Sequence, residues 1–331
     1  MNAVRHHLRF IFVILFSYVL AAPVAAQTCY TSADMDPATL QAVQGAAQQY
    51  FTMAQQGNFA GLRSAAIPAL ANSFDAVNGA IGEHQKDLQG QPQTTGAFVL
   101  DASSAGGTLE RAEFYCGIFN SPNRVGFLIP NLPPGKYAFV SESVNSGKPV
   151  SVNLVMQENG GRWQLAGLTI EPHTVAGHDS NWYLTQARSY HQSGANLTAY
   201  LYYWMAWKLA APAEIEYTAT RDQIADEMAK AKPANWPTST NPMTLSANGK
   251  TYRVTTLFPE SVGEDLDVIV KYQALSELSN TAAAFSDNMA VIKGLVAQYP
   301  ELRNGFGGVV ARAVAPNGAD YGTMLAMKDV K

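Results

Sequence analysis

The stretch LVMQENGGRWQLAGLTIEPHTVAGHDSNWYLTQARSYHQSGANLTAYLYYWMAWKLAAP, residues 154–212, decides how this chain is divided. Its first part carries two apolar segments around the turn sequence Asn159-Gly160-Gly161, which is typical of a β-hairpin. A polar loop with two histidines follows, and two helical segments rich in aromatic residues complete the stretch. We therefore expect one domain before it, a helical bridge within it and a second domain after it.

The segment before the bridge, residues 36–172, is predicted to form an α+β domain. Asp36 and Pro37 are favoured at the first positions of a helix, and apolar residues then recur at helical spacing. After Gly90 the sequence changes to short apolar segments separated by turn residues, which indicates an antiparallel meander of strands. In residues 150–157 apolar and polar residues alternate, which predicts a sheet with one buried face. Helices followed by antiparallel strands are typical of the α+β class.

Two segments of this domain resemble the nuclear transport factor 2-like superfamily, which includes the SnoaL-like cyclases and ketosteroid isomerase. They are the helix exit QQGNFAGL at residues 55–62 and the closing hairpin LVMQENGGRWQLAGLTI at residues 154–170. The resemblance implies helices packed on a curved antiparallel sheet, which form a cone with an open pocket. It also implies that catalytic members carry carboxylates, tyrosines or histidines inside the cone.

No complete catalytic set of that superfamily can be matched to this sequence residue by residue. Glu113, Tyr115 and His173 are the candidate acid–base groups, because they lie on predicted strands or at the rim of the cone. An alternative fold rests on FLIPNLPPGKY at residues 127–137, which is similar to the edge of carboxypeptidase-regulatory, transthyretin-like β-sandwiches. Pro-Pro-Gly before a strand is also ordinary turn chemistry, so both folds stay open.

The bridge, residues 178–232, is predicted to contain two helices at residues 180–192 and 197–210. Their pattern of large and small residues resembles a single tetratricopeptide hairpin. The second helix, LTAYLYYWMAWKLA, is apolar on all sides, which predicts burial between the two domains. The alternative is an exposed aromatic surface that binds a sugar or a peptide. Its candidate residues are Tyr200, Tyr203, Trp204 and Trp207.

The loop before the first bridge helix contains His173, His178 and Asp179, whose side chains are possible metal ligands. They do not have the spacing of one helix face, and no third ligand lies nearby in the sequence. We therefore expect Asp179 to cap the helix and the histidines to be loop residues. No metal and no cofactor are expected.

Residues 243–331 are predicted to form a second small α+β domain. Asn248-Gly249 and Asn317-Gly318 mark two hairpins, because both residues of such turns adopt positive φ. Between them lie a strand at residues 266–272 and a helix at residues 280–298. We expect one helix on a sheet of about five strands. This half of the chain shows no resemblance to a known family.

Export is predicted from the N-terminal segment and from the two cysteines. In residues 1–26, Arg5 and Arg9 are followed by an apolar segment and small residues, which is typical of a signal peptide of the bacterial kind. The two cysteines, Cys29 and Cys116, are then expected to form a disulfide. We expect a secreted or periplasmic protein that is not inserted in the membrane after cleavage. The net charge of −4 argues against nucleic acid as a partner.

Three functions fit these observations. The first is a non-enzymatic module that binds a small apolar ligand or an envelope protein. The second is a structural cell-envelope protein. The third is a SnoaL-like isomerase, dehydratase or cyclase that uses the cone pocket. Several titratable groups converging in the pocket would favour the enzyme, an apolar pocket would favour the binding module, and a filled one the structural protein.

Overall fold

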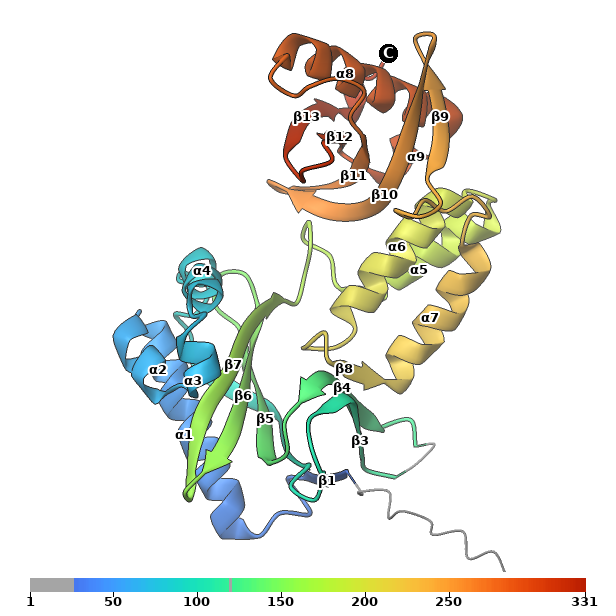
Figure 1. Ribbon diagram of the computed structural model, residues 1–331. Helices are drawn as coiled ribbons and strands as arrows, with labels where there is room; N and C mark the ends of the chain where they lie inside the picture. Colours follow the sequence, from blue (N-terminus) through green and yellow to red (C-terminus); the bar gives the residue numbers. More distant parts are fainter. Residues whose placement is uncertain (1–26, 119–120) are drawn as a thin grey trace, which may run out of the picture.

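The computed structural model describes residues 27–118 and 121–331, so the predicted signal peptide lies outside the described residues. The described chain has α+β architecture with three sheets, none of which closes into a barrel (Figure 1). None of its helices is long and apolar enough to cross a membrane.

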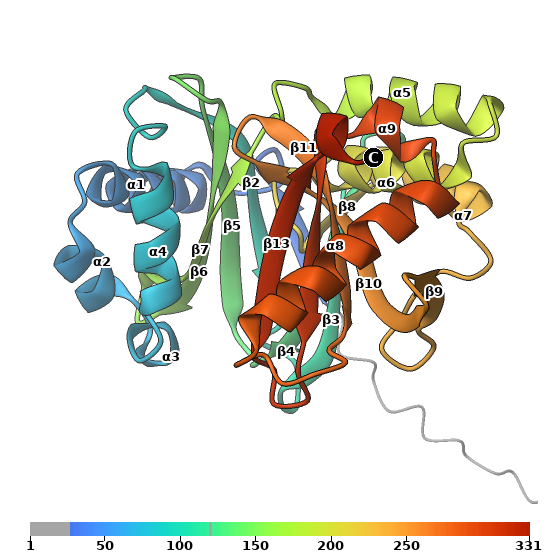
Figure 2. The same ribbon diagram turned by 90° about the horizontal axis from the view of Figure 1, so that it is seen from above.

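The first sheet is antiparallel and is covered on one face by the N-terminal helices (Figures 1 and 2). The carboxylate of Asp36 accepts hydrogen bonds from the backbone N–H groups of Ala38 and Thr39, as expected for a helix cap. The helices are α1 (Pro37–Gln55), α2 (Phe59–Ala65), α3 (Pro68–Ala71) and α4 (Asp75–His84). In spatial order the strands are β1 (Thr28–Thr31), β2 (Pro92–Asp101), β5 (Lys136–Val144), β6 (Val150–Asn159) and β7 (Arg162–Pro172).

The expectation of a single meander is wrong, because two of the strands after Gly90 belong to a second sheet. β3 (Leu109–Cys116) and β4 (Val125–Leu132) leave the first sheet and pair with β8 (Glu216–Thr218), which follows the bridge helices. Gly126 permits this pairing, because a Cβ atom there would lie 2.0 Å from the ring of Tyr217. Phe114 and Phe127 of this sheet pack with Phe139 of the first sheet in a second core layer.

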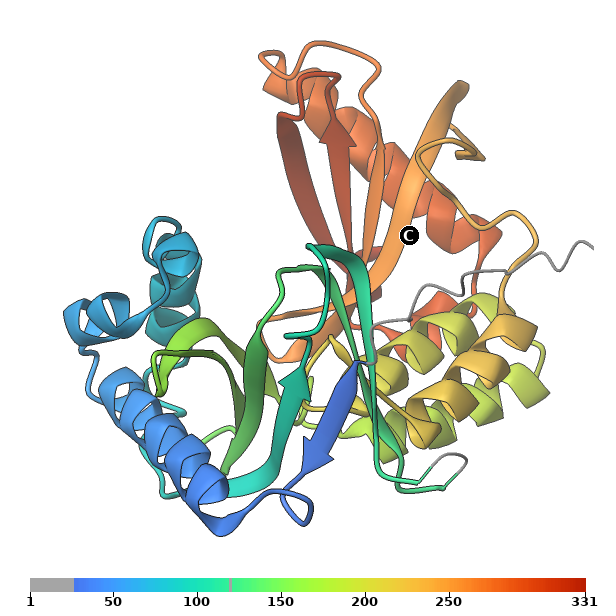
Figure 3. The same cartoon turned by 60° about the horizontal axis from the view of Figure 1, so that its bottom comes forward.

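The predicted disulfide between Cys29 and Cys116 is present. Cys29 lies on β1 of the first sheet and Cys116 on β3 of the second, so the bond joins the two sheets. Figure 3 shows β1, in blue, alongside β2 and close to β3. The half-buried edge strand β1 is thereby held to both layers of the first domain.

The bridge contains α5 (Ser180–Gln192), α6 (Asn196–Leu209) and α7 (Ala219–Ala231), which pack side by side (Figure 1). Most of α6 is buried, as its apolar surface predicts. The predicted location between two domains is wrong, however. The buried residues of α6 belong to one core with the C-terminal domain, whereas the first domain has two cores of its own. The segment after α6, residues 210–218, returns to the first domain, and Asp222 of α7 pairs with Arg124 there.

The C-terminal domain matches its prediction, with one long helix on a five-stranded sheet (Figure 2). Asn248 and Gly249 have the predicted positive φ, at 49° and 71°. At the other turn Gly318 has positive φ, at 85°, and Asn317 does not, so that turn is of another type. The strands in spatial order are β13 (Asp320–Ala326), β12 (Gly308–Val314), β11 (Asp265–Gln273), β10 (Lys250–Val262) and β9 (Met243–Ala247). The helices are α8 (Thr281–Gln298), α9 (Leu302–Gly305) and a 3-10 turn at Met327–Asp329.

Asp267 of β11 is fully buried, and in the described chain no hydrogen bond of good geometry reaches its carboxylate. Burial, followed by the charge of Asp265, raises the pKa of Asp267, although the Gly308 N–H beside it acts in the opposite direction. The folded state therefore binds this proton more tightly than the unfolded state does. Its contribution to stability is present below about pH 4 and is lost as pH rises through the raised pKa.

We expect Asp267→Asn to increase the free energy of unfolding at pH 8 by roughly 1 to 2 kcal/mol, because it removes an unpaired buried charge. Urea denaturation of both proteins at pH 5 and pH 8 measures the effect, which should be smaller at pH 5. The exposed neighbour Asp265→Asn is the control and should give a smaller increase. A loss of stability at pH 8 in Asp267→Asn would show that the carboxylate is satisfied.

Candidate functional site

A cavity of about 410 Å³ lies on the face of the first sheet that the N-terminal helices leave uncovered. Its floor is formed by β2, β5, β6 and β7, and its walls by β4, β8, the start of α5 and the segment 209–212 after α6. It continues the layer in which Phe98, Phe127 and Phe139 pack between the two sheets. The cavity thus occupies the place where the second sheet ends and the bridge begins.

The floor of the cavity is a row of short polar side chains. Along β5 the residues facing this layer change from Tyr137 and Phe139 to Ser141 and Ser143. Ser151 of β6 lies directly opposite Ser143. Ser141 and Ser151 are only 1% and 3% exposed, because the bridge covers the end of the sheet. The alternation in β6 predicted a row of polar residues facing solvent. In the structure this row lines a cavity that the bridge partly covers.

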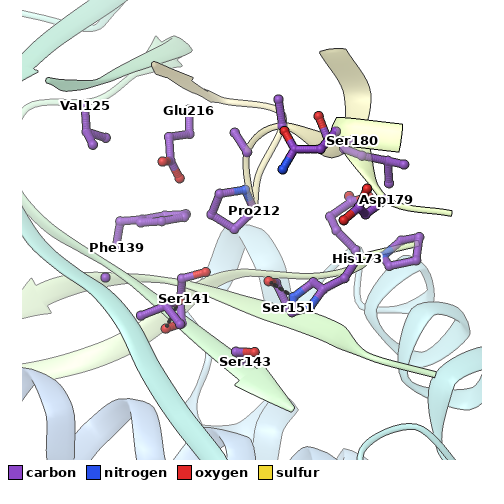
Figure 4. A pocket seen from close by; sticks show the side chains of 18 of the residues that line it. Val125, Phe139, Ser141, Ser143, Ser151, His173, Asp179, Ser180, Pro212 and Glu216 are labelled. Atoms are coloured by element: carbon purple, nitrogen blue, oxygen red, sulfur yellow. Dashed lines mark hydrogen bonds between the residues drawn. The ribbon is translucent and has the colours of Figure 1, made fainter. Parts of the chain in front are cut away.

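These polar groups form hydrogen bonds among themselves (Figure 4). His173 Nε2 lies 2.7 Å from Ser151 Oγ. Ser141 Oγ donates to Asn153 Oδ1 at 2.6 Å, and the Asn153 amide donates to the carbonyl oxygen of Pro212 in the cavity wall. Burial lowers the pKa of His173, so its ring is held neutral to a lower pH than usual. The network fixes the floor relative to the segment that closes the cavity.

Glu216 is the most unusual residue of the site. It lies on β8, is 7% exposed, and extends toward the cavity on the side of Phe139 (Figure 4). In the described chain its carboxylate takes part in no hydrogen bond or ion pair. Burial raises the pKa of Glu216 to about 7, although the nearby Arg221 acts in the opposite direction. This carboxyl group is therefore poised between its acid and its base form at neutral pH.

The other two acidic groups of the cavity, Glu171 and Asp179, differ in their surroundings. Burial raises the pKa of Glu171, which the charge of Lys208 opposes. Asp179 accepts a hydrogen bond at 2.9 Å from the backbone N–H of Trp182 and so caps α5, as predicted. No lysine or arginine is among the described residues that line the cavity. Its charged surface is thus acidic apart from the single imidazole of His173.

Arg221 of α7 holds the segment that closes the cavity. It is 2% exposed, and its guanidinium lies 4.2 Å from the centre of the Trp207 ring. It donates hydrogen bonds to five backbone carbonyl oxygens around the turn from α6 to β8. These belong to Trp207, Lys208, Ala213, Glu214 and Glu216. The guanidinium is therefore directed at the backbone, and the carboxylate of Glu216 remains available to the cavity.

The candidate acid–base residues do not come together. His173 lines the cavity. Glu113 lies on β3, where it receives a hydrogen bond from Arg111 at 2.6 Å, and it does not line the cavity. Tyr115 on the same strand donates to Glu113 at 3.3 Å and packs edge-on against Tyr217. β3 is not among the elements that line this cavity, although β4 and β8 of the same sheet are, so a role of Glu113 and Tyr115 in acid–base chemistry stays a prediction.

The candidate metal ligands are separated by their contacts. His173 is bonded to Ser151, and Asp179 caps α5. The ring of His178 stacks on Trp182 at 3.6 Å between centres. In residues 27–118 and 121–331 no group of three or more histidine, cysteine or acidic side chains is placed to hold a metal ion.

The candidate aromatic surface is largely covered. Tyr200 and Tyr203 are buried, and the strap before the C-terminal domain places Trp236 4.4 Å from the ring of Tyr200. Trp204 and Trp207 are half-buried and border a second cavity of about 430 Å³. Ligand binding to these aromatic residues stays a prediction. Of the four side chains, those of Trp204 and Trp207 remain partly accessible to a ligand.

Sequence reasoning missed Glu216 and the serine row. Glu216 stands in a short segment with no periodicity, and its burial follows from the pairing of β8 with β4, far away in the chain. The serines gave a signal, since a strand with polar residues at every second position can face an internal cavity as well as solvent.

Comparisons of the chain with protein-family models, with curated proteins and with solved structures found no match.

Proposed function

We propose that this protein binds a small organic molecule in the cavity between its first sheet, β8 and the segment 209–212. The observation that carries the proposal is Glu216, a residue only 7% exposed, whose carboxyl group faces a cavity and has no hydrogen bond or ion pair in the described chain. Buried polar groups are normally hydrogen-bonded, so a group left without a partner at a cavity suggests that a ligand supplies one. The apolar wall around Phe139 and the polar floor give such a ligand two distinct sides.

The cavity size supports a small ligand. Its volume of about 410 Å³ lies at the lower end of the range of about 300 to 1,000 Å³ for small-molecule sites. The hydrogen-bonded floor also supports binding, because it presents fixed polar groups. We further propose that binding takes place outside the cytoplasm, since a disulfide joins the two sheets and persists in oxidising compartments. The resemblance to nuclear transport factor 2-like proteins agrees with a pocket on a curved sheet and remains part of this proposal.

The test is a screen of water-soluble fragments by ligand-observed NMR on the purified protein. Ala210→Trp fills the cavity from the end of α6, and Ala282→Trp on the exposed surface of α8 is the matched control. We expect fragments that bind the parent and Ala282→Trp with equal affinity and are lost in Ala210→Trp. Hits that bind all three proteins equally, or the absence of any hit, would refute the proposal. A structural role in the cell envelope would then be the function to consider.

Acid–base catalysis is the second candidate, because Glu216 and His173 line the same cavity. A carboxyl group with a pKa near neutrality and a neutral imidazole can donate and accept a proton at pH 7. This supports an isomerase or dehydratase of the SnoaL-like kind. A bound fragment that is recovered chemically changed from the parent, and unchanged from Glu216→Gln, would favour catalysis over binding.

A further inference from the structure

We infer that the molecule bound in this cavity is an organic cation, with an ammonium group at Glu216 and a hydrocarbon part against Phe139 and Phe98. The inference rests on the proposed function and adds the chemical class of the ligand. It follows from three features of the cavity: the sign of its charges, the unpaired state of one carboxylate and the aromatic wall beside it.

The charges of the cavity exclude an anion. Glu171, Asp179 and Glu216 line it, and the described lining contains no lysine or arginine. An anionic ligand would face like charges at close range, with no cationic side chain in the lining to offset them. A cation meets the opposite situation, since its charge takes the place that a lysine or arginine normally occupies beside a buried carboxylate.

Glu216 has room for a donor that the chain does not provide. Arg221 is the nearest cation, but its guanidinium donates to the carbonyl oxygen of Glu216 and not to its carboxylate. The carboxylate of Asp179 caps the start of α5. Glu171, like Glu216, takes part in no ion pair in the described chain, although the charge of Lys208 opposes the rise of its pKa. An ammonium group has three N–H donors and no acceptor, which matches an acceptor-only carboxylate.

The aromatic wall fits the rest of such a ligand. Phe139 lies at the same side of the cavity as Glu216 (Figure 4), and its ring centre is 4.8 Å from that of Phe127. Phe98 adds a third ring at 5.1 Å from Phe127. Aromatic faces attract cations and also bury hydrocarbon. A neutral alcohol would gain from burying its hydrocarbon part against these rings, but not from their attraction for a cation.

The affinity should depend on pH, because the carboxyl group must be ionised to hold a cation. The charged and titratable groups around it are Arg221 from α7, Glu171 and His173 from β7 and Asp179 from the start of α5. Binding should shift Glu216 toward its ionised form and so release protons near neutral pH, because burial raises the pKa of its free carboxyl group. His173 stays neutral in this range, so it contributes little to the release.

The experiment compares amines with uncharged and anionic analogues on the same skeletons. Benzylamine, benzyl alcohol and benzoate form one set, and the cyclohexylmethyl and butyl series form two more. Isothermal titration at pH 8 should show amines binding at least about tenfold more tightly than their analogues. Titration at pH 7 in buffers of different ionisation enthalpy should show the proton release.

Glu216→Gln is the decisive variant, and Glu214→Gln is its control, because Glu214 is exposed and two residues away. We expect Glu216→Gln to abolish the preference for amines and the proton release, whereas Glu214→Gln keeps both. If Glu216→Gln does not fold, the preference of the parent for amines over their uncharged and anionic analogues, and its loss in Ala210→Trp, still decide.

If the uncharged or anionic analogues bind as tightly as the amines, and their binding is lost in Ala210→Trp, the inference of a cationic ligand is wrong. The proposed binding function then still stands. Binding of no compound in any series would overturn both.

Discussion

Arg221→Met should lower the free energy of unfolding by about 3 to 5 kcal/mol, because a buried acceptor that loses its donor costs about 1 to 3 kcal/mol and several lose theirs here. The substitution leaves five backbone carbonyl oxygens without their donor and removes the cation nearest to Glu216. Unsatisfied buried acceptors oppose folding, so the turn between α6 and β8 should loosen. Urea denaturation of the parent and the variant measures the loss.

The same variant should also alter the cavity. β8 and the segment 209–212 form its wall, so their release should abolish the binding of any fragment that Ala210→Trp also excludes. Without the positive charge of Arg221, the pKa of Glu216 should rise further. In any variant that remains folded, NMR titration of the Glu216 carboxyl can follow this second effect.

Arg303→Met is the matched control for Arg221→Met. Its guanidinium donates one hydrogen bond, at 2.9 Å to the carbonyl oxygen of Val330. Loss of one hydrogen bond should lower the free energy of unfolding by about 1 kcal/mol. Arg221→Lys should retain the charge but not the forked geometry, and so fall between the parent and Arg221→Met. Equal losses in Arg221→Met and Arg303→Met would contradict a special role for Arg221.

Removal of the disulfide is the second large effect. Cys29 and Cys116 are 87 residues apart. In the chain-entropy model a closed loop of this size stabilises the folded state by roughly 4 kcal/mol. We expect the double variant Cys29→Ser/Cys116→Ser to lose about this much, because the unfolded chain gains freedom and β1 is no longer held to β3.

Denaturation with and without a reducing agent tests this expectation. Reduction should destabilise the parent to the level of the double variant and leave the double variant unchanged. The free energies of unfolding, extrapolated to zero urea, are the quantities to compare. A reduced parent that unfolds at the same urea concentration as the oxidised one would show that the sheets are held together by packing alone.

The sequence by itself determined the features that depend on neighbouring residues. Asp36 and Asp179 accept hydrogen bonds from the first turns of α1 and α5, as their types and positions predicted. Asn248-Gly249 forms its hairpin because those two residues tolerate positive φ. The disulfide was predictable because the chain has two cysteines and a segment typical of export.

The tertiary structure alone decided where the strands of the first domain pair and what their faces contact. β3 and β4 have the same local character as β2 and β5, so nothing within them indicates that they join β8, about 100 residues later in the chain. That pairing brings Glu216 to Phe139 and covers Ser141 and Ser151. The cavity exists because two sheets and the end of α6 meet, and such long-range contacts depend on packing of the whole chain rather than on local propensity.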